Sequence, residues 1–386
     1  MKKSSFFEEL KNVLFQQGLL MWVFFAVVYS IFAPYHVYIK DLFCMIVLGT
    51  LLGYKDKQMQ WLFAFSLVYT IMIYFNGLSE SHFESLSYLI GPVAFYLWGK
   101  AVMKKSSSPE AVSTFFLLLA FFSSYVLITN NLQDVADSGI VNVERKIEGF
   151  ENAATMQGLV ASIGLIGVAY VIAYKAVGKL KSLLFIILFV FNLFVILHLI
   201  NRTGIIVALI TIFTTALYTL RSSKRSIFTL IVVSIFIYLG LQQTGILSND
   251  LLEAYQARND MNAVTAGERF DRWGPALGYL FIHPFGWVHS ENVGFAHNLW
   301  LDIARRAGFV PFVIFLVFTI KNIRIFIKLL KLDTPFVGFL VGVNTCFLIS
   351  ASVEPVIEAR STYFYLICMV WGIQYQYYLQ QNKIRI

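Results

Sequence analysis

The feature that most constrains this chain is a succession of apolar runs separated by short polar segments. A helix that spans a bilayer needs about 20 predominantly apolar residues, with a range of about 17–25. Because a backbone in lipid must satisfy its own hydrogen bonds, each run is predicted to be a helix. The sequence thus predicts an all-α, polytopic integral membrane protein with about twelve transmembrane helices, at residues 15–33, 37–54, 60–76, 86–103, 111–129, 153–174, 180–199, 203–220, 226–243, 308–327, 335–351 and 361–379.

The composition excludes an ordinary soluble domain. Hydrophobic residues make up 58% of the chain and charged residues only 13%. Soluble globular proteins carry about 25% charged residues, because their surface faces water. The net charge of +8 does not indicate a nucleic-acid partner, because the basic residues stand in small clusters between the apolar runs. Such clusters are typical of topology signals.

The distribution of charge predicts the orientation of the helices. With twelve spans and the loops numbered alternately from the inside, 20 of the 30 Lys and Arg residues fall in cytoplasmic segments. Conversely, 17 of the 22 Asp and Glu residues fall on the other side. This asymmetry follows the positive-inside rule, so both termini are expected in the cytoplasm.

The spacing of the runs divides the chain into three parts. Residues 1–243 carry the first nine expected spans, and residues 308–386 carry the last three and a cytoplasmic tail. Between them, residues 244–307 form a long loop on the outer side, which is expected to contain short helices. It is the one soluble segment large enough to build a site, and it carries the candidate site.

The sharpest polar stretch in that loop surrounds His297. The apolar residues between Leu299 and Ala307 follow a helical period, which predicts a short amphipathic helix at the membrane surface that ends at Gly308. His297 and Asn298 stand at its start. The positive end of the helix dipole disfavours a charged imidazole, and a neutral imidazole suits a general base. The alternative is that His297 only caps the helix.

Asp302 is a candidate supporting residue on the same helix. It precedes Arg306 by four residues, so the two side chains can pair on the polar face.

Arg202 begins another candidate site, at the outer end of an expected span and between strongly apolar segments. A charge at this place is costly unless it reaches the interface or is used. One reading is that the side chain extends into the interface. The other is that its guanidinium binds an anion, most plausibly a lipid phosphate.

A third candidate is the stretch from Gly267 to Trp273. Arg269 and Arg272 lie close enough in sequence to meet one phosphate. Glu268 and Asp271 can equally neutralise them in a solvated turn. The sequence leaves both readings open.

The segment from Glu354 to Arg360, in the last outer loop, is expected to be a solvated turn, although it can also line the same cavity as the other candidates. No metal or cofactor is expected. His283, His289 and His297 match no metal-binding spacing, and the three cysteines stand singly inside apolar runs.

These motifs, in this order, resemble those of the O-antigen ligase and O-antigen polymerase superfamily. An Arg-Thr-Gly motif is found at Arg202-Thr203-Gly204, and a Gly-x-Arg-x3-Trp motif at Gly267 to Trp273. A Pro-x-Gly motif follows at Pro284-Phe285-Gly286, and a His-Asn motif followed by a Gly is found at His297-Asn298 with Gly308. The resemblance covers about residues 195–375, together with the overall twelve-helix plan. The chain departs from the ligase pattern at Pro311, where ligases have a small or hydroxyl residue.

The resemblance implies a metal-independent glycosyltransferase of the bacterial inner membrane with a periplasmic site, acting in lipopolysaccharide biosynthesis. The donor would be a glycan on undecaprenyl pyrophosphate. The acceptor would be lipid A-core for a ligase, or a second lipid-linked repeat for a polymerase. By this resemblance, Arg202 and Arg269 would bind the pyrophosphate and His297 would activate the acceptor hydroxyl, with Arg272, Asn298, Asp302 and Arg360 in support. Two other classes stay open, a lipid-linked oligosaccharide flippase and a membrane scaffold.

Overall fold

The computed structural model is helical wherever it describes the chain, and it contains no strand in those ranges. The described residues are 44–45, 47, 56–78, 82–106, 108–138, 154–174, 179–198, 201–220, 269–290, 294, 296–359 and 361–384.

Long helices occupy the expected spans that fall in these ranges. They are α4 (Lys57–Phe75), α5 (His82–Lys105), α6 (Pro109–Ser138), α7 (Ala154–Tyr174), α8 (Lys179–His198), α9 (Arg202–Leu220), α14 (Phe309–Leu329), α15 (Pro335–Val353) and α17 (Ser361–Ile384). Seven helices of the described chain, namely all of these except α6 and α17, are long and apolar enough to cross a membrane. The chain is therefore an all-α, multi-pass membrane protein.

The total of twelve spans stays a prediction. The expected spans 15–33, 37–54 and 226–243 lie outside the described residues, apart from Cys44, Met45 and Val47.

Three shorter helices complete the described fold, namely α12 (Arg269–Ile282), α13 (Leu299–Ala307) and α16 (Val356–Ala359). Two of them, α12 and α13, lie in the segment 244–307, as the sequence predicts. Residues 244–268 lie outside the described ranges, and the location of this segment on the outer side stays a prediction.

The chain forms two compact units, each built from segments far apart in sequence. Unit 1 comprises Met1–Leu118, Arg272–Leu332 and Ala351–Ile386, and unit 2 comprises Leu119–Asp271 and Asp333–Ser350. Unit 1 thus holds α4, α5, α13, α14, α16, α17 and most of α12, whereas unit 2 holds α7, α8, α9 and most of α15.

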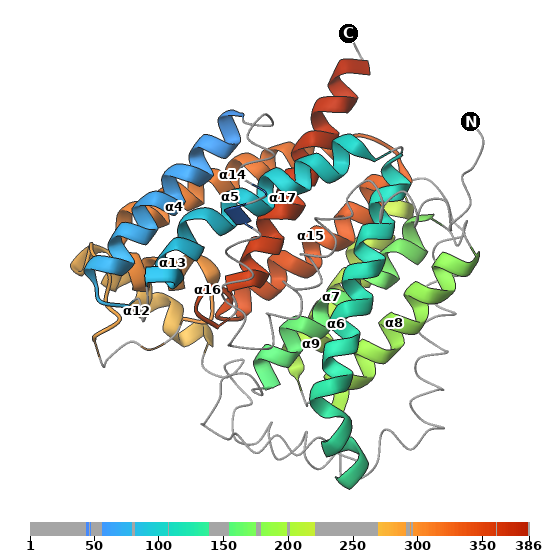
Figure 1. The fold of residues 1–386 in the computed structure, drawn as a ribbon, viewed down its shortest axis with the longest axis horizontal. Helices are drawn as coiled ribbons and strands as arrows, with labels where there is room; N and C mark the ends of the chain where they lie inside the picture. The colour runs from blue at the N-terminus through green and yellow to red at the C-terminus, as the bar shows by residue number, and fades with distance from the viewer. Residues whose placement is uncertain are drawn as a thin grey trace. The chain divides into compact units, whose positions relative to one another are not determined.

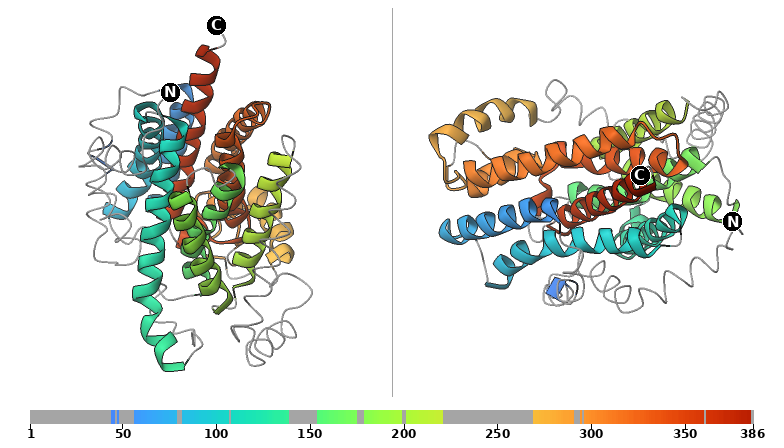
Figure 2. Two further views of the ribbon diagram at one scale, coloured as in Figure 1. Left: turned by 90° about the vertical axis from the view of Figure 1, so that its right-hand side faces the viewer. Right: turned by 90° about the horizontal axis from the view of Figure 1, so that it is seen from above.

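In unit 1, α4, α5, α14 and α17 lie side by side (Figure 1, Figure 2). The backbones of α5 and α17 approach each other closely. A Cβ atom on Gly99 would collide with the carbonyl oxygen of Met369, and one on Gly372 would collide with that of Tyr96. Small residues permit such backbone contact between helices in membranes, where the hydrophobic effect does not drive helices together.

A buried ion pair joins two helices at one end of unit 1. Asp56 caps the start of α4 by accepting hydrogen bonds from the N–H groups of Gln58 and Met59 at 2.7 and 2.8 Å. The same carboxylate pairs with Lys100 of α5, whose side chain is 4% exposed. Because each charge has a partner, the pair can stay buried.

Unit 2 is held by small residues and polar contacts between helices. A Cβ atom on Gly342 of α15 would collide with Ala169 of α7. Asn192 of α8 donates a hydrogen bond of 2.6 Å to Ser124 of α6. Such contacts link transmembrane helices without exposing polar atoms to lipid.

Candidate functional site

The backbone at His297 is the starting point of the candidate site. Among the described residues, His297 is the one non-glycine residue with a positive φ, at 52°. Residues other than glycine rarely adopt this left-handed backbone conformation. Residues held in such sparsely populated conformations cluster at functional sites. The imidazole is half-buried, and its Nδ1 atom is fully buried.

Asp302 holds this unusual turn in place. One carboxylate oxygen accepts the N–H of Ala296 at 2.9 Å, and the other accepts the N–H of Asn298 at 3.0 Å. These two amides flank His297 on either side. Since Asp302 is fully buried, its charge acts at short range and in low dielectric. The carboxylate thus fixes the backbone that presents the imidazole.

Asn298 starts α13 and connects the turn to a neighbouring helix. Its Oδ1 atom accepts the N–H groups of Trp300 and Leu301 at 3.2 and 3.3 Å, which makes it the N-cap residue. Its Nδ2 atom donates to the carbonyl of Ser352, near the end of α15, at 3.1 Å. His297 therefore directly precedes a capped helix, as the sequence predicts.

The surroundings of α13 differ from the sequence-based expectation. The helix and its end at Gly308 are confirmed. The expected exposure of its polar face is wrong, because all residues of α13 except Trp300 are buried in the protein, including Asp302, Arg305 and Arg306, whereas its location at the membrane surface stays a prediction. Arg305 and Arg306 are each only 8% exposed. What the sequence presents as a polar face is thus inside unit 1.

Tyr88 of α5 accepts a hydrogen bond from one of these buried arginines. The Nη1 atom of Arg306 donates to the Tyr88 hydroxyl at 3.1 Å, and its guanidinium carbon lies 5.5 Å from the ring centroid. The hydroxyl in turn donates to the carbonyl of Ile357 in α16 at 3.3 Å. This contact links three helices, and it involves a tyrosine that belongs to none of the sequence motifs.

The turn at Glu354 is also buried. Glu354 is 2% exposed, and Val356 and Ile357 are fully buried. The expectation of a solvated turn is therefore wrong for these residues. The side chains of Glu358 and Arg360 lie outside the described part of the chain.

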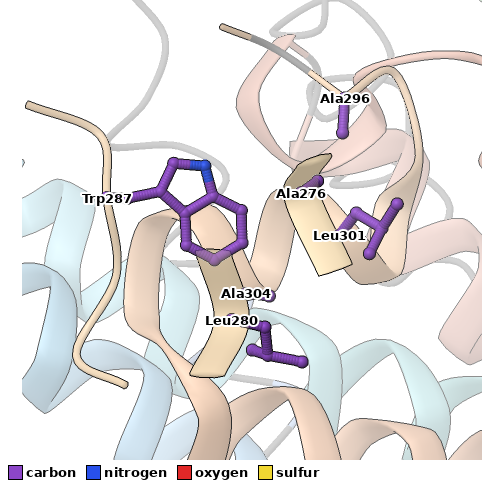
Figure 3. Packing of buried hydrophobic residues seen from close by; sticks show 6 residues of the cluster. All are labelled: Ala276, Leu280, Trp287, Ala296, Leu301 and Ala304. Carbon is purple, nitrogen blue, oxygen red and sulfur yellow. The ribbon is translucent and has the colours of Figure 1, made fainter. Parts of the chain in front are cut away.

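The segment that ends at Trp273 reaches the same turn. The indole Nε1 of Trp273 donates to the carbonyl of Ala296, the residue before His297, at 3.0 Å. Farther along α12, Ala276 and Leu280 pack with Trp287, Ala296, Leu301 and Ala304 (Figure 3). This small apolar cluster fixes α12 against α13.

The Pro284-Phe285-Gly286 motif meets the other end of α13. The carbonyl of Pro284 accepts the N–H of Phe309 at 2.8 Å, and the N–H of Trp287 donates to the carbonyl of Arg305 at 2.8 Å. Gly308 has a φ of 83°, and a Cβ atom there would collide with the Pro284 carbonyl. Position 308 therefore requires glycine, because two of the sequence motifs pack against each other there.

Asn76, at the end of α4, fastens the same junction. Its Nδ2 atom donates to the carbonyls of Phe285 and Arg306 at 2.8 Å each. Its own carbonyl lies 2.9 Å from Nε2 of His289. Asn76 carries no motif in the sequence, and only the fold reveals its role.

The predicted site residues fall into two groups. The structure brings His297, Asn298 and Asp302 together, with Trp273 beside them. Arg272 is half-buried on α12, and its Nη1 atom is the nearest described atom to a Cβ placed on Gly294, at 3.9 Å.

The remaining predicted arginines are not placed relative to His297. Arg202 is the first residue of α9 in unit 2, where Asn201 accepts the N–H of Gly204 at 2.8 Å. Arg269 is the first residue of α12. The side chains of Arg202, Arg269 and Arg360 lie outside the described part of the structure.

No group of three or more His, Cys, Asp or Glu side chains in the described ranges is arranged to hold a metal ion. His283 instead packs on Tyr279, with ring centroids 5.1 Å apart. The described arrangement offers an imidazole on a turn that a buried carboxylate holds, and the helix that follows this turn carries two buried arginines in its last turn. Such a set can take up a proton and can stabilise negative charge.

In comparisons with protein-family models, curated proteins and solved structures, the chain matches none.

Proposed function

We propose that this protein is a membrane glycosyltransferase of the O-antigen ligase type, which transfers a glycan from undecaprenyl pyrophosphate to a sugar hydroxyl. One observation carries the proposal. Three of the motif segments behind the resemblance, around Trp273, Pro284 and His297, are separate in sequence, and all three contact α13 or the turn before it. His297, which directly precedes α13, has a strained backbone.

In the proposed reaction, His297 accepts the proton of the acceptor hydroxyl as its oxygen attacks the anomeric carbon. The bond from that carbon to the pyrophosphate oxygen breaks, and the lipid pyrophosphate leaves. Arg202 and Arg269 bind the pyrophosphate and stabilise its growing charge without metal or nucleotide. Asp302 acts through the backbone and is a positioning residue.

The distribution of charge along α14 supports a periplasmic location of the site. This helix has 21 residues, and at about 1.5 Å per residue it is long enough to cross the hydrocarbon core. Gly308 and α13 stand at its start, Lys321 and Lys328 stand in its second half, and Lys331 stands just after its end. If the basic end is cytoplasmic, as the positive-inside rule requires, α13 faces the periplasm of the inner membrane.

The proposal is tested with His297→Ala, Arg202→Ala and Arg269→Ala in cells that depend on this protein for polymer-bearing lipopolysaccharide. Each variant should lose the ladder of long chains on a gel while the protein stays inserted in the membrane. Arg324→Ala, an exposed arginine near the other end of α14, is the control and should keep the ladder. Normal ladders from all three site variants would refute the proposal.

The same gels separate a ligase from a polymerase of the same superfamily. Loss of a ligase leaves long chains on the lipid carrier. Loss of a polymerase leaves a single repeat on the core. The ligase is the form we propose, and a single-repeat product would assign the protein to the polymerases.

A further inference from the structure

Helix α12 is apolar on two opposite sides. On the inner side, Ala276 and Leu280 are 0% and 2% exposed and pack against α13 (Figure 3). On the outer side, Leu277, Phe281 and Ile282 are 48%, 74% and 69% exposed. A helix that packs one side against a protein core and turns the other to water carries polar residues on the outer side. The outer side of α12 therefore does not fit water.

The absence of charge extends along the whole outer side. From Gly274 to Phe285, every exposed residue is glycine, proline or a large apolar residue, namely Gly274, Pro275, Leu277, Gly278, Phe281, Ile282, Pro284 and Phe285. The charged residues Asp271 and Arg272 stand at the opposite, N-terminal end of the helix. An uninterrupted exposed apolar surface of this kind marks a site of contact with a membrane or with another protein.

The neighbouring helix α14 indicates the depth of this surface in the membrane. The ring of Phe281 lies 6.0 Å, centroid to centroid, from the ring of Phe309, the first residue of α14. Because α14 is just long enough to cross the hydrocarbon core, its first turn lies near the edge of that core. Phe309 is itself 38% exposed, and Ile323 and Ile327, which lie on the same side of α14 farther along, are 39% and 52% exposed. The outer side of α12 thus continues the exposed apolar side of a membrane span.

We propose that α12, with Phe285, is an interfacial helix whose outer side is immersed in the hydrocarbon of the adjoining bilayer leaflet. Its charged N-terminal end then lies among the headgroups, as in other helices that lie in the plane of a membrane surface. Pro284 and Gly286 contact the C-terminal end of α13, so lipid contact at Phe281, Ile282 and Phe285 would reach that end of the helix, opposite to His297. This inference requires only a membrane protein and does not depend on glycosyl transfer.

The test uses single-cysteine variants of the full chain in nanodiscs, with Cys44, Cys346 and Cys368 replaced by alanine. Phe281→Cys and Ile282→Cys carry an environment-sensitive fluorophore. Ile323→Cys on α14 serves as the lipid-facing control, and Asp271→Cys on α12 serves as the water-facing control. Each sample is quenched in turn by nitroxide-labelled phospholipid and by aqueous iodide.

Positions 281 and 282 should resemble position 323, with strong quenching by the lipid nitroxide and little by iodide. Position 271 should show the reverse. Iodide quenching at 281 and 282 equal to that at 271 would overturn the proposal. Protection of both positions from both quenchers would also overturn it, because protein rather than lipid would then cover this side. Neither outcome bears on whether the protein transfers glycans.

Discussion

At the scale of single residues, the turn at His297 balances an unfavourable backbone against strong hydrogen bonds. A non-glycine residue with positive φ costs about 1–3 kcal/mol. Hydrogen bonds to a charged group each contribute about 1.5–3 kcal/mol, and Asp302 accepts two of them from the flanking amides. The two hydrogen bonds to the carboxylate therefore stabilise the turn by more than the positive φ costs. The charge of Asp302 can be tested by a conservative substitution.

Asp302→Asn should lower transfer activity by at least about tenfold, or ~1.4 kcal/mol in the barrier. The amide has one acceptor oxygen, so one of the two flanking N–H groups would face an NH2 donor. Activity of the purified variant, compared with that of the exposed Asp333→Asn, measures the effect. Wild-type activity in Asp302→Asn would show that the carboxylate does not position His297.

Gly308→Ala should destabilise the protein by about 1–3 kcal/mol, because alanine would adopt a strained φ and meet the Pro284 carbonyl. The matched control is Gly278→Ala in α12, where a Cβ meets nothing within 4 Å. It should be neutral or gain up to about 1 kcal/mol from better helix propensity. Thermal unfolding in detergent compares the two, and equal midpoints would contradict the structural role of Gly308.

At the scale of elements, α13 shows what the sequence can and cannot predict. Its start close after His297, its helical period and its end at Gly308 are local features, and the sequence predicts all three, although the residue that caps the helix is Asn298 and not His297. Its burial depends on Tyr88, which is 218 residues from Arg306 along the chain. Nothing in the local pattern indicates such a partner, so the charged residues of α13 were expected at a surface. The expected exposure of Glu354 was also wrong, because the burial of this residue depends on the fold and not on the local sequence.

Tyr88→Phe tests the junction of α5, α13 and α16. The substitution keeps the ring but removes a buried hydroxyl that contacts Arg306 and the Ile357 carbonyl. Loss of a partner for buried polar groups costs about 1–3 kcal/mol, so the unfolding midpoint should fall. Tyr125→Phe, at a tyrosine that is 52% exposed, should leave the midpoint unchanged. If the two variants unfold alike, the buried contact contributes nothing.

At the scale of the whole molecule, the helices of the described chain were predictable because lipid permits few alternatives. An apolar run of sufficient length must form a helix in a bilayer, so hydropathy alone locates most of them. The division into two units was not predictable, because each unit combines segments that are separated in the sequence by parts of the other unit. The position of Arg202 relative to His297 depends on the same long-range arrangement.

The orientation of the helices gives a prediction at this scale. In intact cells with a permeable outer membrane, a polar thiol reagent should label Gly294→Cys, an exposed position near the candidate site. It should label Lys331→Cys, just past the end of α14, only after the inner membrane is opened. The reverse pattern would place the turn at His297 in the cytoplasm and would remove the basis for a lipid-linked glycan donor.

The most direct test of the central claim is transfer by the purified protein in nanodiscs. The protein is given an undecaprenyl-pyrophosphate-linked glycan with lipid A-core or with a second lipid-linked repeat, without metal. We expect a new glycosidic product and released lipid pyrophosphate from the wild type, and neither from an equally stable His297→Ala variant. No product from the wild type with either acceptor, or an equal rate from His297→Ala, would contradict the account.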